Sequence, residues 1–356
     1  MQVNPAFWFK KKVFLTGHTG FKGAWLSYWL QIMGAQVYGY SLVPNTSPSM
    51  YNILNIERLI YLSKIADIRD VNTLKNSILE FSPDVVIHMA AQPLVRYSYC
   101  SPIETFEVNS MGTAYLLESL RAVQTVRSTI IVTTDKCYEN LEKISGYRED
   151  DAMGGHDPYS SSKGCAELIT SAYRRSFFSN NKNVNAVATA RAGNVIGGGD
   201  WSTDRLIPDV FRAIESGDSV LIRNCDATRP WQHVLEPLSG YLILAQALYE
   251  SGDEFATGWN FGPNDSDAYP VGVLMDMILK KWGSGSWIKE LSKQPHEAQS
   301  LRLDCSKARK YLKWAPRWNI ETAVEESVNW YRAYIKNADM QEVTLEQIIR
   351  YQAANI

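Results

Sequence analysis

The chain has little net charge and no long apolar run. Its 356 residues include 36 Lys and Arg against 38 Asp and Glu, which gives a formal net charge of -2. A charge this small gives no electrostatic reason to expect binding to nucleic acid or to an anionic membrane. No uninterrupted apolar segment approaches the ~18 residues that a membrane span needs, and the first residues show no signal-peptide pattern. We therefore expect neither a membrane nor a nucleic-acid partner.

Cysteine is scarce, and no pair of cysteines has a functional spacing. The five cysteines form no C-x-x-C motif, and their number is odd. The five histidines show no metal-ligand spacing. These absences argue against a disulfide framework and against a metal centre. Reduced thiols in a cytoplasmic protein are the expectation.

Glycine is concentrated where it has a chemical use. Lys11 to Thr16 reads as a short apolar strand, and large apolar residues recur at helical spacing from Phe21 onward. Between them stand three glycines at a spacing of three: Gly17, Gly20 and Gly23. A strand–glycine turn–helix brings bare backbone N–H groups and a positive helix end to one point, which stabilises an anion such as a dinucleotide pyrophosphate. The three glycines would serve the tight turn, the approach of the phosphate and close helix–strand packing.

Acidic residues are missing where a dinucleotide-binding fold usually has one. The second predicted strand, residues 36–42, ends in Ser41 and Leu42, and the first acidic residue of the chain is Glu57. No acid is therefore available there for the ribose hydroxyls. Between Lys22 and Arg58 there is also no basic residue for the extra phosphate of NADP. Charge alone does not decide the cofactor, but the missing arginine favours NAD.

Later strand ends also have features of a cofactor site. A third strand candidate within residues 61–68 ends in Asp67-Ile68, where an adenine would reach. The apolar run 84–89 looks like a buried parallel strand. It is followed by the small Ala90 and Ala91 and then Gln92, which would let a cofactor lie close to the backbone.

Strands alternate with helical stretches throughout the first half. Residues 106–122 are helical in pattern, and residues 128–134 read as another buried strand. This alternation predicts an α/β fold with a doubly wound parallel sheet of the Rossmann type. We expect residues 1–190 to form the NAD-binding domain, with 233–264 returning to it. Residues 191–232 and 265–356 would form a smaller α/β substrate lobe.

The segment DPYSSSK, residues 157–163, has the pattern of an acid–base site. On a helix, Tyr159 and Lys163 lie one turn apart on the same face. A lysine ammonium stabilises a phenolate and lowers the pKa of the tyrosine, which makes it a usable acid or base. An ordinary surface pair of residues is the alternative reading.

Together these motifs resemble the extended short-chain dehydrogenase/reductase superfamily, in the group that acts on nucleotide sugars. The similarity rests on TGHTGFKG, HMAAQ, Asn109, TTDK and YSSSK, and it continues through ARAGNVIGGGDW, DRLIPD, RPWQHV, NFGP and LRLDCSKARKYLKWAP. Within the group, GHTGFKGAWL, the Asp135-Lys136 pair, RPWQHVLEPLSGYL and PHEA are most similar to CDP-D-glucose 4,6-dehydratases.

The resemblance implies roles for residues that pattern alone does not assign. The implied catalytic residues are Thr134, Asp135, Lys136, Tyr159 and Lys163. The implied cofactor-binding residues are Gly17, His18, Thr19, Gly20, Phe21, Gly23, Ser41, Asp67, Ile68, Ala90, Ala91, Gln92, Asn109, Thr133, Tyr159 and Lys163. The implied substrate-binding residues are Asn194, Arg205, Leu206, Arg229 and Asn260, and no metal is implied.

Two features of the second half stay open. Gly197 to Gly199 reads either as a flexible loop that folds over a ligand or as a plain surface turn. Arg205, Arg223 and Arg229 suit a substrate pyrophosphate, although surface salt bridges are the plain alternative. Many relatives have an arginine before the strand of the LRLD motif, but here that stretch reads HEAQS, residues 296–300, so we transfer no role to it.

The resemblance implies an intramolecular redox dehydration of CDP-D-glucose to the 4-keto-6-deoxy sugar, for deoxysugar biosynthesis of the O-antigen type. Two alternatives remain. One is a 4,6-dehydratase or 4-epimerase acting on a dTDP-, GDP- or UDP-sugar, and the other is a non-catalytic NAD-binding regulator. Helical residues 112–123 and 159–174 would pair with their mates in a homodimer or homotetramer.

Overall fold

The computed structural model describes residues 2–143, 145–179, 185–203, 205–290 and 301–354. The α-helices are α1 Pro5–Trp8, α2 Phe21–Ile32, α3 Met50–Ile53, α4 Ile56–Leu59, α5 Val71–Phe81, α6 Val95–Cys100, α7 Pro102–Phe106, α8 Gly112–Leu120, α9 Pro158–Tyr173, α10 Leu206–Ser216, α11 Leu235–Ser251, α12 Val271–Trp282, α13 Ile320–Ile335 and α14 Met340–Ala353. The strands are β1 Lys12–Thr16, β2 Gln36–Ser41, β3 Leu62–Ile65, β4 Val85–His88, β5 Ser128–Val132, β6 Ala186–Ala192, β7 Asn194–Ile196, β8 Val220–Ile222, β9 Thr228–His233, β10 Gly258–Phe261, β11 Ala268–Pro270 and β12 Trp287–Lys289.

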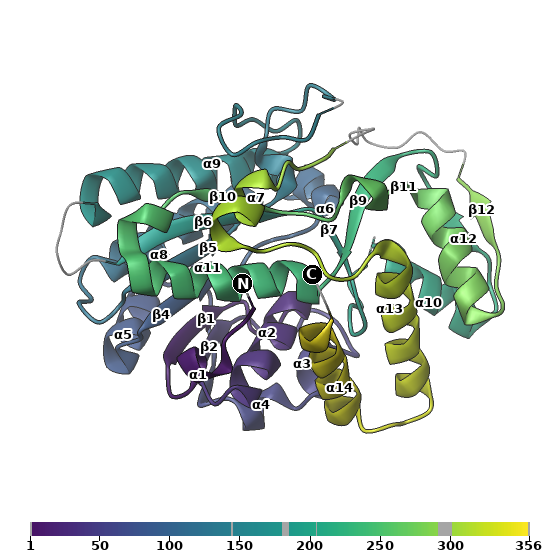
Figure 1. The fold of residues 1–356 in the computed structure, drawn as a ribbon, viewed down its shortest axis with the longest axis horizontal. Coiled ribbons are helices and arrows are strands. Elements are labelled where there is room, and N and C mark those ends of the chain that lie inside the picture. Colours follow the sequence, from purple (N-terminus) through teal and green to yellow (C-terminus); the bar gives the residue numbers. More distant parts are fainter. Residues whose placement is uncertain (1, 144, 180–184, 204, 291–300, 355–356) are drawn as a thin grey trace.

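Seven strands form one sheet in the order β10-β6-β5-β4-β1-β2-β3 (Figure 1). Every neighbouring pair is parallel. The order reverses at β1, and β4 lies on the other side of β1 from β2, as in a doubly wound sheet. The predicted fold class is therefore confirmed. In such sheets ligands bind beyond the carboxyl ends of the strands near the reversal, which is where Gly17 and Met89 follow β1 and β4.

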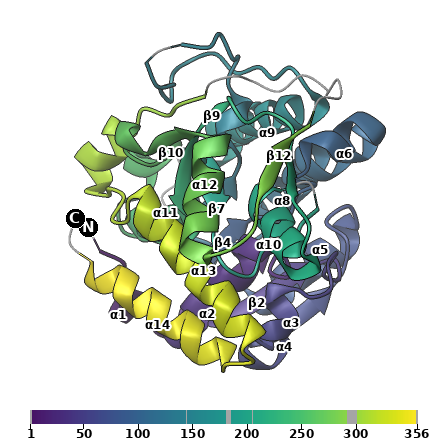
Figure 2. The same cartoon turned by 90° about the vertical axis from the view of Figure 1, so that its right-hand side faces the viewer.

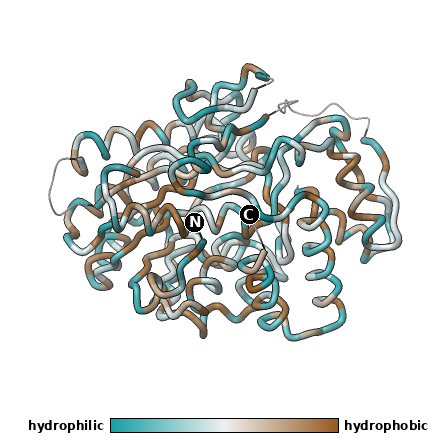
Figure 3. Tube along the Cα trace, in the orientation of Figure 1, coloured by the Kyte–Doolittle hydropathy of each residue, from teal (hydrophilic) through white to brown (hydrophobic). Residues whose placement is uncertain are grey.

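Alternating residues of the strands pack into two apolar cores, one on each face. On β1, Val13 and Leu15 join the core that includes α2 and α11, whereas Phe14 joins the core that includes α5 and α8. Successive side chains of a strand point to opposite faces, and a parallel sheet covered on both faces needs apolar residues at nearly every position. The teal, hydrophilic residues are prominent in the long loop at the top of the view (Figure 3).

A smaller lobe lies beside the sheet. It contains the three-stranded sheet β11-β9-β7 and the pair β12-β8, together with α10, α12 and α13 (Figure 2). The last helix, α14, contacts both α13 of this lobe and the first half of the chain: Trp330 donates to Thr344 at 3.0 Å, and Tyr28 donates to the carbonyl of Gln341 at 2.8 Å. The rings of Trp29 and Tyr351 also meet edge-on. Residues near both ends of the described chain, Gln2, Val3 and Pro5 on one side and Tyr351 and Gln352 on the other, line one cavity. The predicted division at residues 190, 233 and 264 stays a proposal, and α14 links its two parts.

The predicted elements of the first half match the structure to within a few residues, with one difference inside the helix predicted at 106–122. There, residues Glu107–Met111 form a π-helical turn between α7 and α8. Such turns are rare and often lie at functional sites, and this one contains Asn109. Within the described residues, no helix is both long and apolar enough to cross a membrane.

Candidate active site

The glycine turn after β1 is shaped by two close approaches. Gly17 has a φ of +77°, and a Cβ there would lie 2.7 Å from the backbone nitrogen of Ala90. A Cβ on Gly23 would lie 2.0 Å from the carbonyl oxygen of Gly17. Gly20, the residue before α2, has only an ordinary contact there, so its bare Cα leaves room in front of the helix end. This is the cradle that a dinucleotide pyrophosphate requires, so the residues present fit NAD.

The second strand ends in a polar contact rather than a carboxylate. The hydroxyls of Thr19 and Ser41 lie 2.9 Å apart, and Thr19 also donates to the carbonyl of Leu42. His18 lies 2.7 Å from the Ser63 hydroxyl, and its ring packs so tightly against Gly39 that a Cβ on that glycine would overlap it. Burial lowers the pKa of His18 to about 4, so its imidazole is neutral at pH 7.

The remaining predicted cofactor residues lie at the ends of β3 and β4. Asp67 is paired with Arg69 at 2.7 Å, and Ile68 is buried. Asn109 accepts a hydrogen bond from the backbone of Gln92 at 2.8 Å and donates to its carbonyl. Its amide also donates to Ser162 of α9. Asn109 therefore ties the end of β4, where Ala90 and Ala91 lie, to the helix that contains Tyr159.

Three of the predicted catalytic residues follow β5 directly. Asp135 is 1% exposed, and its Oδ1 accepts hydrogen bonds from Thr134 at 3.1 Å and from Lys136 at 3.2 Å. Its Oδ2 has no partner within the described structure. Lys136 also donates to Asn194 at 3.4 Å. The carboxylate thus has one oxygen fixed by the protein and one available to a ligand.

Helix α9 contributes the other two predicted catalytic residues. It begins at Pro158, after Asp157, whose side chain accepts from the amide of Ser160. Burial raises the pKa of Tyr159 to about 12, although a hydrogen bond with Thr134 opposes the rise. Burial lowers the pKa of Lys163 to about 8, and the negative charge of Glu167 opposes that shift. Lys163 donates to the carbonyl of Val132, the last residue of β5, at 3.2 Å.

Lys22 is a site residue that the sequence reasoning missed. Burial lowers its pKa to about 7, and the charges of Arg205, Lys163 and Lys136 lower it further, against the attraction of Asp135. Lys22 thus interacts electrostatically with three other basic side chains and with one carboxylate, and we call Lys22, Asp135, Lys136, Lys163 and Arg205 the cationic cluster. Its net positive charge suits an anionic ligand. The signal in the sequence was a lysine inside the glycine turn, a position next to the expected phosphates.

The predicted substrate residues are only partly brought together. Asn194 contacts Lys136. Arg205 pairs with Asp200 at 3.2 Å, and it directly precedes Leu206, the first residue of α10. Arg229 lies on β9 and is 8% exposed. Asn260 is fully buried, and its amide is used by Tyr138 and by the carbonyls of residues 147 and 304. The structure therefore does not bring Asn260 to the cationic cluster.

Gly197 to Gly199 is neither a flexible loop nor a surface turn, which corrects both readings from the sequence. All three glycines are buried. A Cβ on Gly198 would overlap the ring of Trp330, and one on Gly199 would overlap Met50. The glycines are needed because two bulky side chains pack onto this backbone. The PHEA motif, the stretch 296–300 and Asp204 lie outside the described residues.

Comparison with known proteins agrees with this geometry. A family model described as GDP-mannose 4,6 dehydratase matches residues 14–327. The chain belongs to that dehydratase family. It is 51% identical to the CDP-glucose 4,6-dehydratase of Salmonella typhimurium, over 99% of both chains. It is 25% identical to dTDP-glucose 4,6-dehydratase 1 of Escherichia coli, over 82% of this chain and 83% of the relative.

Solved structures show that the dehydratase shares its fold with epimerases. The UDP-glucose 4-epimerase of Thermotoga maritima aligns with a TM-score of 0.78 and 20% identity, over 91% of this chain and 99% of the epimerase. The dTDP-glucose 4,6-dehydratase of Streptomyces venezuelae, determined with NAD bound, aligns with a TM-score of 0.77 and 20% identity, over 92% and 99%. The family model and the 51% identical relative confirm the predicted membership of the extended short-chain dehydrogenase/reductases.

Behind the catalytic residues the dehydratase has a second buried cluster. Glu167 accepts hydrogen bonds from Thr133 at 2.5 Å and Thr189 at 2.7 Å, and from two nitrogens of Arg191 at 2.9 and 2.8 Å. Arg191 also donates to the hydroxyl of Tyr138 at 2.6 Å. We call these five residues the Glu167 network. Thr133, a predicted cofactor residue, directs its hydroxyl into this network.

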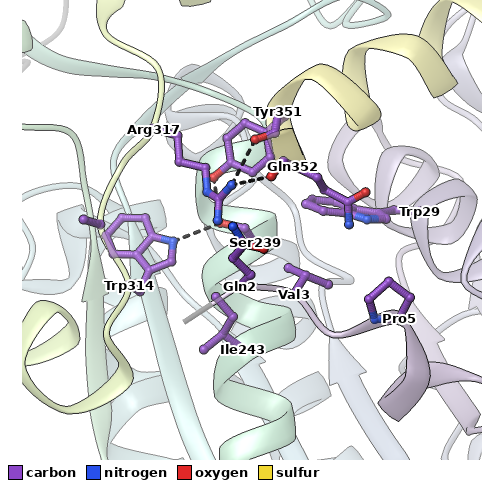
Figure 4. Close-up of a pocket in the computed structure, with 11 residues that line it drawn as sticks. Gln2, Val3, Pro5, Trp29, Ser239, Ile243, Trp314, Arg317, Tyr351 and Gln352 are labelled. Atoms are coloured by element: carbon purple, nitrogen blue, oxygen red, sulfur yellow. Dashed lines mark hydrogen bonds between the residues drawn. The ribbon is translucent and has the colours of Figure 1, made fainter. Parts of the chain in front are cut away.

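The dehydratase also has a cavity of about 220 Å³ next to the chain ends (Figure 4). It lies between α2, α11, α14 and the segment that includes Trp314 and Arg317. Arg317 donates to three carbonyls at the end of α14, and Trp314 donates to Ser239. None of the predicted site residues lines this cavity, so the reaction has no evident use for it.

Proposed function

We propose that this protein is an NAD-dependent 4,6-dehydratase that converts CDP-D-glucose to CDP-4-dehydro-6-deoxy-D-glucose. The observation that carries the proposal is the 51% identity, over nearly the whole of both chains, to an enzyme with that name. The cationic cluster supports it, because a nucleotide diphosphate brings the negative charge that the cluster lacks. The reduced state of the five cysteines supports a cytoplasmic location.

NAD would be held by the glycine turn and by the ends of β2, β3 and β4. When bound, it would supply reversible hydride transfer, taken from carbon 4 of the sugar and given back at carbon 6. We expect NAD to bind more tightly than NADP, because the neutral Thr19–Ser41 contact closes the end of β2 and the sequence has no basic residue between Lys22 and Arg58. Arg69, the nearest arginine after β3, is already paired with Asp67. Titration of both cofactors into the apo-protein checks this, and tighter NADP binding contradicts it.

Tyr159 removes the proton from the carbon-4 hydroxyl in this proposal. Its hydrogen bond with Thr134 places both side chains at one point, so Thr134 orients the same sugar hydroxyl. A buried tyrosine resists ionisation, and a protonated Lys163 one turn along α9 offsets part of that cost. Arg205 acts in the same direction, because its positive charge lowers the pKa of Tyr159.

The elimination of water requires an acid at carbon 6 and a base at carbon 5. Asp135 is the proposed acid, because its Oδ2 has no partner and a protonated carboxyl there gives its proton to the leaving hydroxyl. Lys136 is the proposed base. As an ammonium it donates to Asp135 and Asn194, so it must lose a proton before it acts. Transfer of that proton to Asp135 would leave a neutral amine as the base and a carboxylic acid as the proton donor. A lysine that stays charged and only orients Asp135 is the alternative role.

Solvent deuterium exchange separates these two roles of Lys136. The Lys136→Ala variant is given the 4-keto-6-deoxy product, and exchange at carbon 5 is followed. Loss of exchange, with the first oxidation of CDP-D-glucose still observable, supports the base. Exchange at the native rate assigns Lys136 to the electrostatic role.

Arg205 and Arg229 are proposed to bind the substrate diphosphate, with Asn194 and Leu206 beside the sugar. We assign Asn260 an indirect role, because its amide holds Tyr138 and the segments around residues 147 and 304. We also propose a homodimer or homotetramer formed through α8 and α9. Exposed apolar residues on this part of the chain, Met111 and Leu168 among them, support the interface. Light scattering that finds only monomer at micromolar concentration contradicts it.

Incubation with CDP-, dTDP-, UDP- and GDP-linked sugars, scored for keto product and for epimerised sugar, tests the function. We expect CDP-D-glucose to give keto product in preference to the other nucleotide sugars. Keto product only from another nucleotide reassigns the substrate, and epimerisation without keto product indicates an epimerase. Binding of NAD with no product from any sugar supports the non-catalytic regulator.

A further inference from the structure

Glu167 lies one helical turn beyond Lys163, just as Lys163 lies one turn beyond Tyr159. Residues four apart on a helix share a face and have Cβ atoms ~5–6 Å apart. All three side chains are at least nine-tenths buried, with Lys163 at 6% and Glu167 at 5% exposure. Among the described residues these two groups form no ion pair within 4.0 Å, so Glu167 acts on Lys163 as a buried charge across the low-dielectric interior, where it helps decide whether the ammonium keeps its proton.

Apart from Asp135 of the cationic cluster, the other ionisable groups around Lys163 do not supply a negative charge. Lys22 on α2 adds positive charge, and the imidazole of His88 on β4 is neutral because burial lowers its pKa to about 3. Burial also raises the pKa of the Cys137 thiol, which therefore stays protonated. Among the described residues, Glu167 thus makes the largest charge interaction that opposes the loss of the Lys163 proton.

Glu167 itself stays ionised because its four hydrogen bonds satisfy both oxygens. Arg191 is the bidentate partner, and the hydroxyls of Thr133 and Thr189 complete the set. These bonds hold the pKa of Glu167 below its ordinary value despite its burial. The bond from Thr133 also fixes the residue that directly precedes Thr134. Even the backbone makes room, since a Cβ on Gly258 would lie 2.5 Å from Arg191.

We propose that Glu167 is a positioning residue that keeps Lys163 protonated and fixes the end of β5 beneath the catalytic residues, with Arg191 as the counterion that permits a carboxylate there. The effect on catalysis rests on the proposed function, whereas the effect on the charge of Lys163 does not. The sequence does not predict that Glu167 pairs with Arg191. The two residues are far apart along the chain, and each resembles an ordinary surface charge.

The charge of Lys163 can be measured directly by NMR. Lysine is labelled with ¹³C at the ε carbon, and the Lys163→Met variant identifies the resonance. We expect the titration midpoint of Lys163 to fall by about one unit or more in Glu167→Gln, because an opposite charge is lost at close range. Glu167→Asp restores most of the shift. Thr189→Val is the matched control, since it removes one hydrogen bond and no charge. A midpoint in folded Glu167→Gln that stays at the wild-type value overturns the proposal.

A second variant covers the case in which Glu167→Gln does not fold, because it leaves Arg191 buried and unpaired. The double variant Glu167→Met/Arg191→Met removes both charges together. A lowered Lys163 midpoint in this variant supports the proposal, and an unchanged midpoint overturns it.

Turnover of CDP-D-glucose by Glu167→Gln then gives the catalytic readout. We expect the loss of kcat at alkaline pH to move to lower pH together with the Lys163 midpoint. A lower kcat with an unshifted pH profile would reduce Glu167 to a structural role and overturn the positioning role. If the wild type does not convert CDP-D-glucose, the proposed function fails while the NMR titration still decides the charge of Lys163.

Discussion

The cationic cluster and the Glu167 network meet at the end of β5, yet they are built on opposite rules. In the cationic cluster, four basic side chains share one member carboxylate, Asp135, and one oxygen of that carboxylate has no partner among the described residues. Arg205 also pairs with Asp200 outside the cluster. In the Glu167 network, the carboxylate of Glu167 faces the guanidinium of Arg191, and each carboxylate oxygen accepts two hydrogen bonds.

The difference separates residues kept for a ligand from residues kept for the fold. A buried charge without a full set of partners costs stability, so it persists where a bound molecule completes it. A fully satisfied buried pair contributes order instead. This criterion supports the proposal that the cationic cluster is the reaction site and the Glu167 network its support. Changes in the first are expected to alter activity, and changes in the second to alter stability.

The largest effect is expected for Tyr159→Phe, which removes only the phenolic hydroxyl. We expect turnover of CDP-D-glucose to fall by about 10²–10⁴-fold, the usual contribution of a general acid–base group. Stability is expected to change by at most about 1.5 kcal/mol, because one hydrogen bond is lost. Rates, NAD affinity and thermal unfolding are measured together. Tyr311→Phe makes the same change on an exposed side chain and serves as the control. A Tyr159→Phe protein that retains most of its rate excludes Tyr159 as the base.

Arg191→Met is expected to have the next largest effect, and on stability. It leaves Glu167 ionised and unpaired in the interior, which typically costs about 3–5 kcal/mol. Urea unfolding measures the loss. The matched control is Arg121→Met, because Arg121 and Glu118 form an exposed pair three residues apart on α8 and its C-terminal end. Such a pair is worth about 0–1 kcal/mol. If Arg191→Met and Arg121→Met lost the same free energy of unfolding, the Glu167 network would support the fold no more than a surface ion pair does.

The site residues that could be predicted from the sequence are those whose geometry is fixed locally. Gly17, Gly23, Tyr159 and Lys163 were predicted because a strand, a turn or one helical turn fixes their geometry locally. Lys22 was missed, because its surroundings depend on where Arg205 arrives from a distant part of the chain.

The errors have the same origin as the omission. Gly197 to Gly199 was misread as mobile or exposed, since the sequence does not show that Trp330 and Met50 pack onto it. The pairing of Glu167 with Arg191 could not be predicted, because it forms only when α9 lies against β6. Local periodicity predicts elements, and packing decides which of their side chains meet.

A third buried carboxylate sharpens the comparison by lacking a bidentate cation. Glu236, at the start of α11, accepts from the amides of Arg317 and Trp318 and from the hydroxyl of Tyr351. Burial raises its pKa to about 7. Between pH 4.5 and 7 the folded state therefore binds more protons than the unfolded state, so stability falls as pH rises through this window. Below pH 4.5 the raised pKa of Glu236 contributes about 3 kcal/mol to the free energy of unfolding, which corresponds to two to three pKa units.

Glu236→Gln is expected to flatten this pH dependence. Unfolding free energies of the variant and of the wild type are compared from pH 5 to 8, and the variant is expected to gain relative stability as pH rises. Glu250→Gln, on the exposed end of the same helix, is the control. Parallel curves for Glu236→Gln and the wild type would show that Glu236 is ionised in the folded state at the lower pH as well.

The smallest effect is expected for Lys22→Met, and its sign is the opposite of that for Arg191→Met. Burial and neighbouring cations lower the pKa of Lys22 to about 7, so the unfolded state binds more protons between pH 7 and 10.5. Stability of the wild type therefore rises with pH through that window. Because Lys22 keeps partial contact with solvent, which screens its charge, removal of the ammonium is expected to stabilise the ligand-free protein by only about 1 kcal/mol at pH 7. The gain should shrink toward pH 9, whereas the exposed control Lys75→Met should show no such trend. A loss of stability in Lys22→Met would mean that this lysine supports the fold as Arg191 does, and the excess of positive charge could no longer be read as a place kept for an anionic ligand.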